Sequence, residues 1–316
     1  MTTRKTVLIV GANGRIGGAV AKALLQRGWQ VRGLARDPSA GRQALPGIDW
    51  RTGDAMNAEQ VSAAADGVSA IVHAVNPAGY LNWETLVLPM IDNTIAAARA
   101  AGGARVVLPG TIYNYDVART PLIGAETPQE PRSRKGVIRV AMEQRLEAAA
   151  PEVPSLILRA GDFFGPGARS SWFSQAMVKP DQPVRKIVNV ARGPGHSWAY
   201  LPDLAETFAS LMEAPERLHS FERLQFEGLY DESGTVLADG IRRALGRDIP
   251  SGAFPWWMMQ ALSPFGGFPK EAADIAPYWR WPARFDNRRL VELLGSEPRT
   301  PLDQALRASL ASLGAT

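Results

Sequence analysis

The chain has 316 residues, of which 46% are hydrophobic and 21% are charged, and its formal net charge is +4. This composition is typical of a globular protein with a large core, and it excludes a collagen-like or intrinsically disordered chain. Cysteine is absent, which excludes disulfides, iron–sulfur clusters, thiolate zinc sites and a cysteine nucleophile. The histidines lie far apart at His73, His196 and His219, so we expect no dedicated metal site.

Charge and hydropathy also limit the partners. Lysine and arginine are spread along the chain rather than clustered, so we expect no nucleic-acid-binding surface. No run of about 18 apolar residues is present, so no membrane span is expected. Residues 1–6 lack the apolar region of a signal peptide. We therefore expect a cytoplasmic protein that binds a small molecule.

Strands and helices alternate over the first half of the chain. Strands are expected at 6–10, 29–35, 48–52, 69–75, 104–109 and 154–159, and helices at 15–28, 57–66, 83–101 and 136–150. Such alternation is typical of right-handed crossovers and a parallel sheet. The strand runs VLIV, AIVHAV and RVVL are apolar throughout, as strands covered on both faces should be. The fold class is therefore α/β, with a doubly wound parallel Rossmann sheet over residues 1–159.

The pattern changes after about residue 160, where Pro, Gly and Trp become frequent. Helices are expected only near 202–214, 234–246, 287–294 and 301–313. We expect residues 160–316 to form mostly a smaller, irregular substrate-binding lobe, with some segments near 184–228 returning to the Rossmann sheet. Some of its tryptophans should line a cleft beyond the carboxyl ends of the strands, where an apolar or aromatic substrate would fit better than a nucleotide-sugar.

A glycine-rich loop, GANGRIG at residues 11–17, joins the first strand to the first helix. This context favours dinucleotide binding, because glycines permit a tight turn and a close approach to a pyrophosphate. The N-terminus of the helix then offers free N–H groups and a partial positive charge. The residues of this loop expected to bind the cofactor are Gly11, Asn13, Gly14, Arg15, Ile16 and Gly17.

The end of the second strand indicates which dinucleotide is bound. An acidic residue there would hold the ribose 2′-hydroxyl of NAD. The spacing places Ala35 at that position, with Arg36 next, which leaves room and charge for a 2′-phosphate. Arg15 would add a second cation. We therefore favour NADP, while a shift of one position onto Asp37 would restore the acid and favour NAD.

Several further segments follow the loop in a recognisable order. They are Gly53-Asp54, Val72–Asn76, Asn93, LRAGDFFGPG at 158–167, HSWAYLPDLAE at 196–206 and FDNRRLVELLGSEPRTPLDQAL at 285–306. With these segments the chain resembles the extended and atypical short-chain dehydrogenases/reductases, the group that includes the NAD-dependent epimerases/dehydratases. The resemblance implies that Asp54 contacts the adenine and that Ala74, Val75 and Asn76 lie beside the cofactor.

The same resemblance bears on the catalytic residues, which in this family are a Ser or Thr together with the Tyr and Lys of a YxxxK motif. Thr111 falls on the serine and Tyr115 on the tyrosine of the family's VYG segment. Lys135 falls on the YxxxK tyrosine and Arg139 on its lysine. The catalytic tyrosine is therefore absent, and the active site is atypical.

Three groups are candidates for the missing proton donor. Tyr113, close to Thr111, ranks first, although it would equally suit a packed aromatic between the lobes. Lys135 ranks second: it shares a helix face with Arg139, and a neighbouring guanidinium and burial would both promote loss of its proton. The alternative is that both are ordinary cations of the helix surface or hold cofactor phosphate or ribose. A water molecule held by Thr111 is the third candidate.

Two functions remain open. The first is an NADP-dependent oxidoreductase or epimerase/dehydratase-like enzyme acting on a carbonyl or hydroxyl group, and the second is a non-catalytic NADP-binding sensor or regulator.

The helices at 83–101 and 136–150 are apolar on more than one face. Their apolar residues are Leu86, Ile91, Ile95 and Ala98 in the first and Val137, Val140, Leu146 and Ala149 in the second. Because family members pair such helices, we expect a homodimer.

Overall fold

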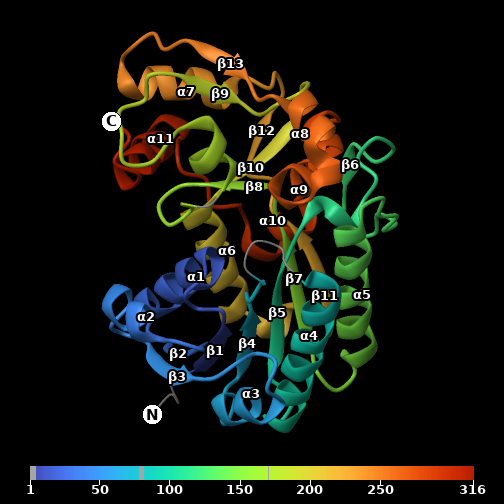
Figure 1. Ribbon diagram of the computed structural model, residues 1–316. Coiled ribbons are helices and arrows are strands. Elements are labelled where there is room, and N and C mark those ends of the chain that lie inside the picture. The colour runs from blue at the N-terminus through green and yellow to red at the C-terminus, as the bar shows by residue number, and fades with distance from the viewer. Residues whose placement is uncertain (1–4, 78–81, 170) are drawn as a thin grey trace. The chain divides into compact units, whose positions relative to one another are not determined.

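The computed structural model describes residues 5–77, 82–169 and 171–316, which form two compact units (Figure 1). The first unit comprises Met1–Gly110, Val137–Arg159 and Ala205–Leu224. The second comprises Thr111–Gly136, Ala160–Leu204 and Gln225–Thr316. The segment 111–136, which follows the fifth expected strand, thus groups with the second unit, and the segment 205–224 groups with the first.

A seven-stranded parallel sheet organises the first unit, in the order β11-β7-β5-β4-β1-β2-β3. Its strands are β1 (Thr6–Val10), β2 (Gln30–Ala35), β3 (Asp49–Thr52), β4 (Ala70–His73), β5 (Arg105–Gly110), β7 (Ser155–Arg159) and β11 (Phe221–Gln225). The doubly wound Rossmann sheet predicted from the sequence is therefore confirmed. β11 is the one strand of this sheet that was not predicted individually, although it falls in the region expected to return to the sheet.

Helices cover both faces of this sheet. They are α1 (Arg15–Gln26), α2 (Ser39–Ala44), α3 (Ala58–Ala64), α4 (Trp83–Ala100), α5 (Arg134–Ala149) and α6 (Leu201–Glu213). The apolar sides of α3, α4 and α5 share one core cluster with Leu8, Ile71 and Val106 of the sheet. Figure 1 shows α1 on the other side of the strands. The expected cap of α3 is present, since the Asn57 side chain accepts a hydrogen bond from the N–H of Gln60 at 3.0 Å.

The second unit contains more regular structure than its sequence suggested. Short strands are β6 (Leu122–Ile123), β8 (Asp162–Phe164), β9 (Ile187–Asn189), β10 (His196–Tyr200), β12 (Leu229–Asp231), β13 (Ser251–Ala253) and β14 (Arg284–Phe285). Its helices are α7 (Val236–Leu245), α8 (Trp256–Leu262), α9 (Gly267–Ile275), α10 (Arg288–Leu294) and α11 (Leu302–Ser312). The sequence did not predict α8 and α9, because Pro255 and Gly266 punctuate that stretch. Each of those two residues instead precedes the first residue of a helix.

The outward faces of α4 and α5 bear on the expected dimer. Ile91, Ala98 and Leu146 are fully buried in the core of the first unit, whereas the side chain of Val137 is 56% exposed. Most of the named apolar residues thus pack within the unit, and the homodimer stays a prediction. Across the described residues, the helices are all too short or too polar to cross a membrane.

A buried ion pair joins α5 to the end of β7. Nη2 of Arg159 donates to both carboxylate oxygens of Glu143 at 2.9 Å, and the two side chains are 0% and 4% exposed. Neither charge has access to bulk water, so each depends on the other and on the neighbouring polar groups for its stability. The pair fixes the α5 backbone relative to the sheet.

We predict that Glu143→Gln destabilises the protein by about 3–5 kcal/mol, because it leaves the Arg159 guanidinium buried without its counter-charge. Urea unfolding measures this change. The matched control is Glu152→Gln, which breaks an exposed ion pair with Arg99 and should cost no more than about 1 kcal/mol. Equal effects of the two substitutions would contradict the prediction.

Candidate functional site

The glycine loop lies against the backbone that follows β4. Gly11 has a φ of +91°, and a Cβ on it would lie 2.7 Å from the nitrogen of Val75 and 2.8 Å from the carbonyl carbon of Ala74. A Cβ on Gly17 would lie 2.4 Å from the oxygen of Gly11. Both positions therefore require glycine, and together they hold β1, α1 and the β4 end in close contact.

The start of α1 is built to face a ligand. Gly14 precedes its first residue, and no side chain caps it. The Gly14 N–H donates to the Gly11 oxygen at 2.8 Å, while Gly14 and Arg15 are exposed and Ile16 is half-buried. The first N–H groups of a helix have no acceptor within it and carry a partial positive charge. A pyrophosphate fits this cradle, because it supplies the acceptors that these N–H groups lack.

Asn13 ties the loop to the segment after β2. Its Nδ2 donates to the Asp37 carbonyl at 3.1 Å, and a Cβ on Gly41 of α2 would lie 2.3 Å from its Oδ1. The structure therefore places Asn13 in a local supporting contact. Its predicted contact with the cofactor stays a prediction.

Ala35 ends β2 and is half-buried, while Arg36 is exposed beside it. The next residue, Asp37, uses its carboxylate within the chain. Its Oδ1 accepts from the Ser39 N–H at 2.9 Å, and hydrogen bonds from the side chain and backbone of Ser39 lower the pKa of Asp37. Asp37 thus serves the start of α2, and the position that ends the strand carries no acid.

Asp54 follows β3 in a turn that its neighbours fix. Its Oδ1 accepts from the Met56 N–H at 2.9 Å, and its own N–H donates to the Gln60 side chain at 2.8 Å. The Asn93 side chain on α4 donates to the Ala55 carbonyl at 2.9 Å. These contacts hold Asp54, which is half-buried, in one backbone conformation.

His73 closes β4 and is buried, while Ala74 and Val75 are half-buried and Asn76 is exposed. The Nδ1 of His73 lies 2.8 Å from Oγ1 of Thr94, which itself donates to the Met90 carbonyl at 3.0 Å. Nδ1 is therefore the donor. Burial, and secondly the charge of Arg139, lower the pKa of His73 to about 3, so the ring is neutral at pH 7.

We predict that His73 makes the protein less stable in acid. Its pKa falls from 6.5 to about 3 on folding, so below pH 6.5 protons bind the unfolded state preferentially. The free energy of unfolding should then drop as pH falls toward 3, by at most about 1.4 kcal/mol per pH unit from this residue. Urea unfolding at pH 7 and pH 4.5 should show a smaller loss for His73→Asn than for the wild type. His219→Gln, at an exposed histidine, should match the wild type, and identical losses for all three would refute the role of His73.

Arg139, at the position of the family's YxxxK lysine, lies in α5 within the first unit. Its guanidinium carbon is 5.0 Å from the centre of the Trp83 ring of α4, and its Nη1 is 3.9 Å from Sδ of Met142. This cation–π contact holds the side chain half-buried.

Thr111, Tyr113 and Lys135 come together in the second unit. Oγ1 of Thr111, directly after β5, accepts from the Tyr113 N–H at 3.2 Å and so caps the 3₁₀ helix η2 (Ile112–Asn114). A Cβ on Gly136 would lie 2.1 Å from the Tyr113 carbonyl oxygen, so the first turn of α5 packs on Tyr113. Lys135, the neighbour of Gly136, therefore belongs to the same group.

Two carboxylates of α9 hold Lys135, and sequence reasoning missed both of them. Its ammonium pairs with Glu271 and lies 3.8 Å from Oδ2 of Asp274, with 9% of the side chain exposed. Burial raises the pKa of Asp274 above its ordinary value, although the charge of Lys135 acts in the opposite direction. Glu271 and Asp274 are three positions apart, which places them on one face of a helix. This pattern indicates a shared site only once α9 is recognised as a helix.

Tyr278, in the 3₁₀ helix η6 (Ala276–Trp279), is a further residue that the sequence did not single out. Its hydroxyl donates to the Tyr113 carbonyl at 3.1 Å, and the two rings meet edge-on with centroids 5.1 Å apart. Tyr115 is 1% exposed in the adjoining core cluster, so the expected VYG tyrosine is a core residue.

An aromatic wall adjoins this group. Trp172 packs against the same core cluster as Tyr113. Its ring centroid also lies 5.4–6.0 Å from four further aromatic rings, those of Phe254, Trp256, Phe268 and Trp279. Phe268 is 57% exposed, so the wall extends to the surface.

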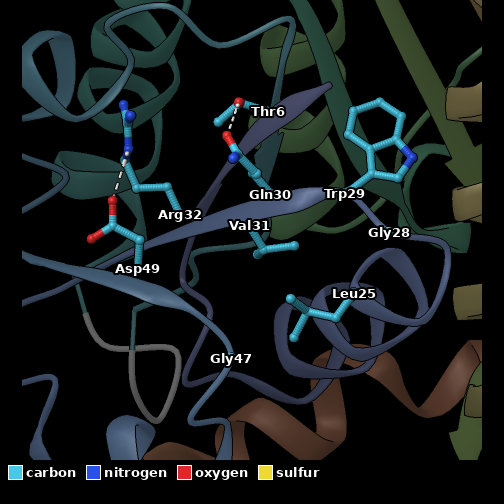
Figure 2. Close-up of a pocket in the computed structure, with 9 residues that line it drawn as sticks. All are labelled: Thr6, Leu25, Gly28, Trp29, Gln30, Val31, Arg32, Gly47 and Asp49. Atoms are coloured by element: carbon cyan, nitrogen blue, oxygen red, sulfur yellow. Dashed lines mark hydrogen bonds and ion pairs between the residues drawn. The ribbon is translucent and has the colours of Figure 1, made fainter. Parts of the chain in front are cut away.

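A separate pocket lies at the amino ends of β1, β2 and β3 (Figure 2). The first residues of three strands line it, and their side chains already bond to one another: Thr6 Oγ1 donates to Gln30 at 3.1 Å, and Arg32 Nε lies 3.6 Å from Asp49. Ligands of open α/β sheets bind at the carboxyl ends of the strands, so this pocket is not the cofactor site.

Residues 5–77, 82–169 and 171–316 contain no cluster of three acidic or histidine side chains suited to a metal ion.

Known proteins resemble parts of this chain. A family model described as NAD(P)H-binding matches residues 11–148. Cinnamoyl-CoA reductase 1 of Oryza sativa subsp. japonica is 36% identical over 115 residues, which are 33% of each chain. The 3-diazoavenalumate denitrifying reductase of a Streptomyces species is 28% identical over 177 residues, 51% of this chain and 57% of that protein. The matched segments thus cover less than two thirds of either relative.

Among solved structures, the UDP-glucuronic acid 4-epimerase of Bacillus cereus, in complex with UDP-glucuronic acid and NAD, superposes with a TM-score of 0.76 at 16% identity. The superposition covers 98% of both chains. At this identity the likeness establishes the fold, which is the fold that the sequence resemblance implied. The family model covers the glycine loop, the β4 end and most of α5, so residues 11–148 match an NAD(P)H-binding family model within a Rossmann-type fold.

Proposed function

We propose that the protein is an NADP-dependent oxidoreductase or epimerase/dehydratase-like enzyme that acts on a carbonyl or hydroxyl group of a small molecule. One observation carries the proposal: Thr111 directly follows β5 of the nucleotide-binding sheet and accepts a hydrogen bond from Tyr113, and Gly136, the neighbour of Lys135, packs on the Tyr113 carbonyl. Hydroxyl, phenol and ammonium groups are those that bind and protonate a carbonyl oxygen. The names of the relatives, which are reductases and an epimerase, support the same class.

The second unit is proposed to bind the substrate. Its aromatic wall around Trp172 favours an apolar or aromatic compound, because such a surface offers stacking and few hydrogen bonds. The relative named for cinnamoyl-CoA carries an aromatic acyl group in that name, which supports this choice. A nucleotide-sugar, as in the epimerase complex, would need more polar partners than the wall provides.

The cofactor is proposed to be NADP. Ala35 leaves space at the end of β2, Arg36 is exposed beside it, and Asp37 is bonded to Ser39. The arrangement therefore offers a cation for a 2′-phosphate, and the last residue of β2 is not an acid. Arg15 in the loop would add a second charge.

We predict that Arg36→Ala weakens binding of NADPH more than binding of NADH, by about 1–3 kcal/mol for one charge-assisted contact. Titration of the cofactor fluorescence measures both affinities. Gly14→Val should abolish binding of both, because the side chain would occupy the pyrophosphate path, whereas Gly47→Ala, whose Cβ would make only ordinary contacts at 3.4 Å, should change neither. Equal losses of NADPH and NADH in Arg36→Ala would argue for NAD.

When bound, the nicotinamide supplies or accepts a hydride. The chain must then provide or take up a proton at the substrate oxygen. Tyr113 is the proposed donor, since a phenol both hydrogen-bonds a carbonyl oxygen and transfers its proton, and Thr111 beside it would orient that oxygen. Lys135, buried and paired with Glu271, is the second candidate, and a water held by Thr111 is the third. Arg139 is proposed to act near the cofactor from α5.

We predict that Tyr113→Phe lowers kcat by about 10²–10⁴-fold while NADPH affinity is unchanged. Steady-state rates with a panel of aldehydes, ketones and imines, followed by NADPH absorbance, measure the effect. Tyr230→Phe, a phenol outside the site, should behave as the wild type. Normal turnover by Tyr113→Phe together with loss of turnover in Lys135→Met would transfer the role to Lys135.

The missing YxxxK tyrosine favours one other function, a non-catalytic NADP-binding sensor or regulator. The two proposals differ in one result. An enzyme oxidises NADPH with at least one member of the carbonyl panel, whereas a sensor binds NADPH tightly and turns over none.

We also propose a homodimer through α4 and α5, supported by the exposed Val137 side chain and by the half-buried Val140 and Leu86. Light scattering at micromolar concentration should give twice the mass of one chain. Val137→Glu should reduce this mass, because it places a charge within the apolar contact, while Gln144→Glu, at an already polar position of α5, should leave it closer to the wild-type value. A monomer mass for the wild type would reject the dimer.

A further inference from the structure

A buried histidine in the second unit makes hydrogen bonds at both ring nitrogens. His196 on β10 is 3% exposed, with Nε2 2.9 Å from Oδ2 of Asp162 on β8 and Nδ1 3.2 Å from the Tyr278 carbonyl on η6. The ring stacks on Trp279 at 4.0 Å and 17°, and Trp198 meets it at 5.2 Å. Its orientation is therefore fixed on every side.

The two partners of His196 hold the ring at its two nitrogens. A carbonyl oxygen only accepts, so Nδ1 donates to Tyr278, and an ionised Asp162 also only accepts. Nε2 faces Oδ2 of Asp162, so the carboxylate and the carbonyl hold the ring from its two sides.

The other groups around the ring do not compete for these bonds. Across the β10–β12 pairing, His196 is opposite Asp231, whose Oδ1 accepts from the Val236 N–H at 3.1 Å. Two further carboxylates, Asp274 and Asp116, act on the Tyr278 hydroxyl, whose pKa their charges raise. Asp162 is thus the carboxylate bonded to the ring.

Tyr278 carries the constraint from His196 to Tyr113. Its backbone carbonyl is bonded to His196, while its hydroxyl donates to the Tyr113 carbonyl at 3.1 Å and its ring lies edge-on to the Tyr113 ring. Burial raises the pKa of Tyr278, so the hydroxyl remains a donor at neutral pH. Asp162, His196, Tyr278 and Tyr113 form one chain of contacts from β8 to η2.

We propose that His196, held by Asp162, is a positioning residue for Tyr113 and acts through Tyr278. The proposal rests on the proposed function in one respect, namely that Tyr113 is the proton donor. Without His196, η6 loses the bond that fixes the Tyr278 carbonyl, and the Tyr113 ring gains rotational freedom. The transferring proton is then less often aligned with the substrate oxygen, while substrate and cofactor still bind.

The first experiment needs no substrate. The protein has six tyrosines, so labelling with 3-fluorotyrosine gives a small set of fluorine resonances, and Tyr113→Phe and Tyr278→Phe assign two of them. His196→Gln and Asp162→Ala should shift or broaden both resonances, and the exposed-residue control His219→Gln should leave them in place. Unchanged Tyr113 and Tyr278 resonances in a folded His196→Gln protein would overturn the proposal.

A conservative variant separates positioning from general loss of packing. In Asp162→Asn the side-chain amide donates to Nε2 while Nδ1 still donates to Tyr278, so both bonds survive. Asp162→Asn should therefore retain the wild-type resonances that Asp162→Ala loses. Loss in both variants at equal melting temperature would contradict the hydrogen-bond assignment, and the Asp162 pair keeps the test available if His196→Gln fails to fold.

The second experiment uses turnover. His196→Gln should lower kcat by about 10-fold with KM and the NADPH dissociation constant changed less than about 2-fold, and Asp162→Asn should restore most of the rate lost in Asp162→Ala. In the Tyr113→Phe background His196→Gln should have no further effect, because the two act on one step. Additive effects would overturn the proposal. If no substrate of the panel turns over, the proposed function fails, and the fluorine spectra still decide whether His196 orders Tyr113.

Discussion

The close approach of Gly11 to the backbone of Ala74 and Val75 is the constraint on which the nucleotide-binding part of the structure depends. With less than 3 Å between the place of a Gly11 Cβ and that backbone, the loop after β1 has no freedom to move toward β4. The close contact of Gly17 with the Gly11 carbonyl oxygen then determines where α1 begins. The direction of the α1 N-terminus follows, and with it the position available to a pyrophosphate.

The helix α5 has residues in both units. Its first residues, including Lys135 and Gly136, belong to the second unit, and Val137–Ala149 belong to the first. The buried Arg159–Glu143 pair anchors the later part to the sheet. Gly136 presses its first turn against the Tyr113 carbonyl. One helix thus contributes both to the nucleotide-binding core and to the candidate proton-transfer group.

Sequence alone predicted the parts of the fold that follow from local physical rules. Apolar strand runs, helical periodicity and the glycine loop identified six of the seven strands of the main sheet, because burial on both faces leaves a clear pattern. The short strands and the helices α8 and α9 were not found, since their packing depends on distant partners and their prolines and glycines resemble loop sequence. Thr111, Tyr113 and Lys135 were named from motif positions, and the structure brings them together. Glu271, Asp274 and Tyr278 were beyond reach, because only the fold places α9 and η6 beside residues 111–136.

The commitment of Asp37 to Ser39 has an evolutionary consequence. This carboxylate accepts from the Ser39 N–H in the turn before α2, so an acid at the last position of β2 itself would come from a change at Ala35. Alanine and aspartate codons differ by a single base when the third base is a pyrimidine. An acid at the last position of β2 is thus one point mutation away, without disturbing the turn that Asp37 and Ser39 form. The aromatic rings around Trp172, by contrast, pack on one another, so a change at one of them affects its neighbours as well.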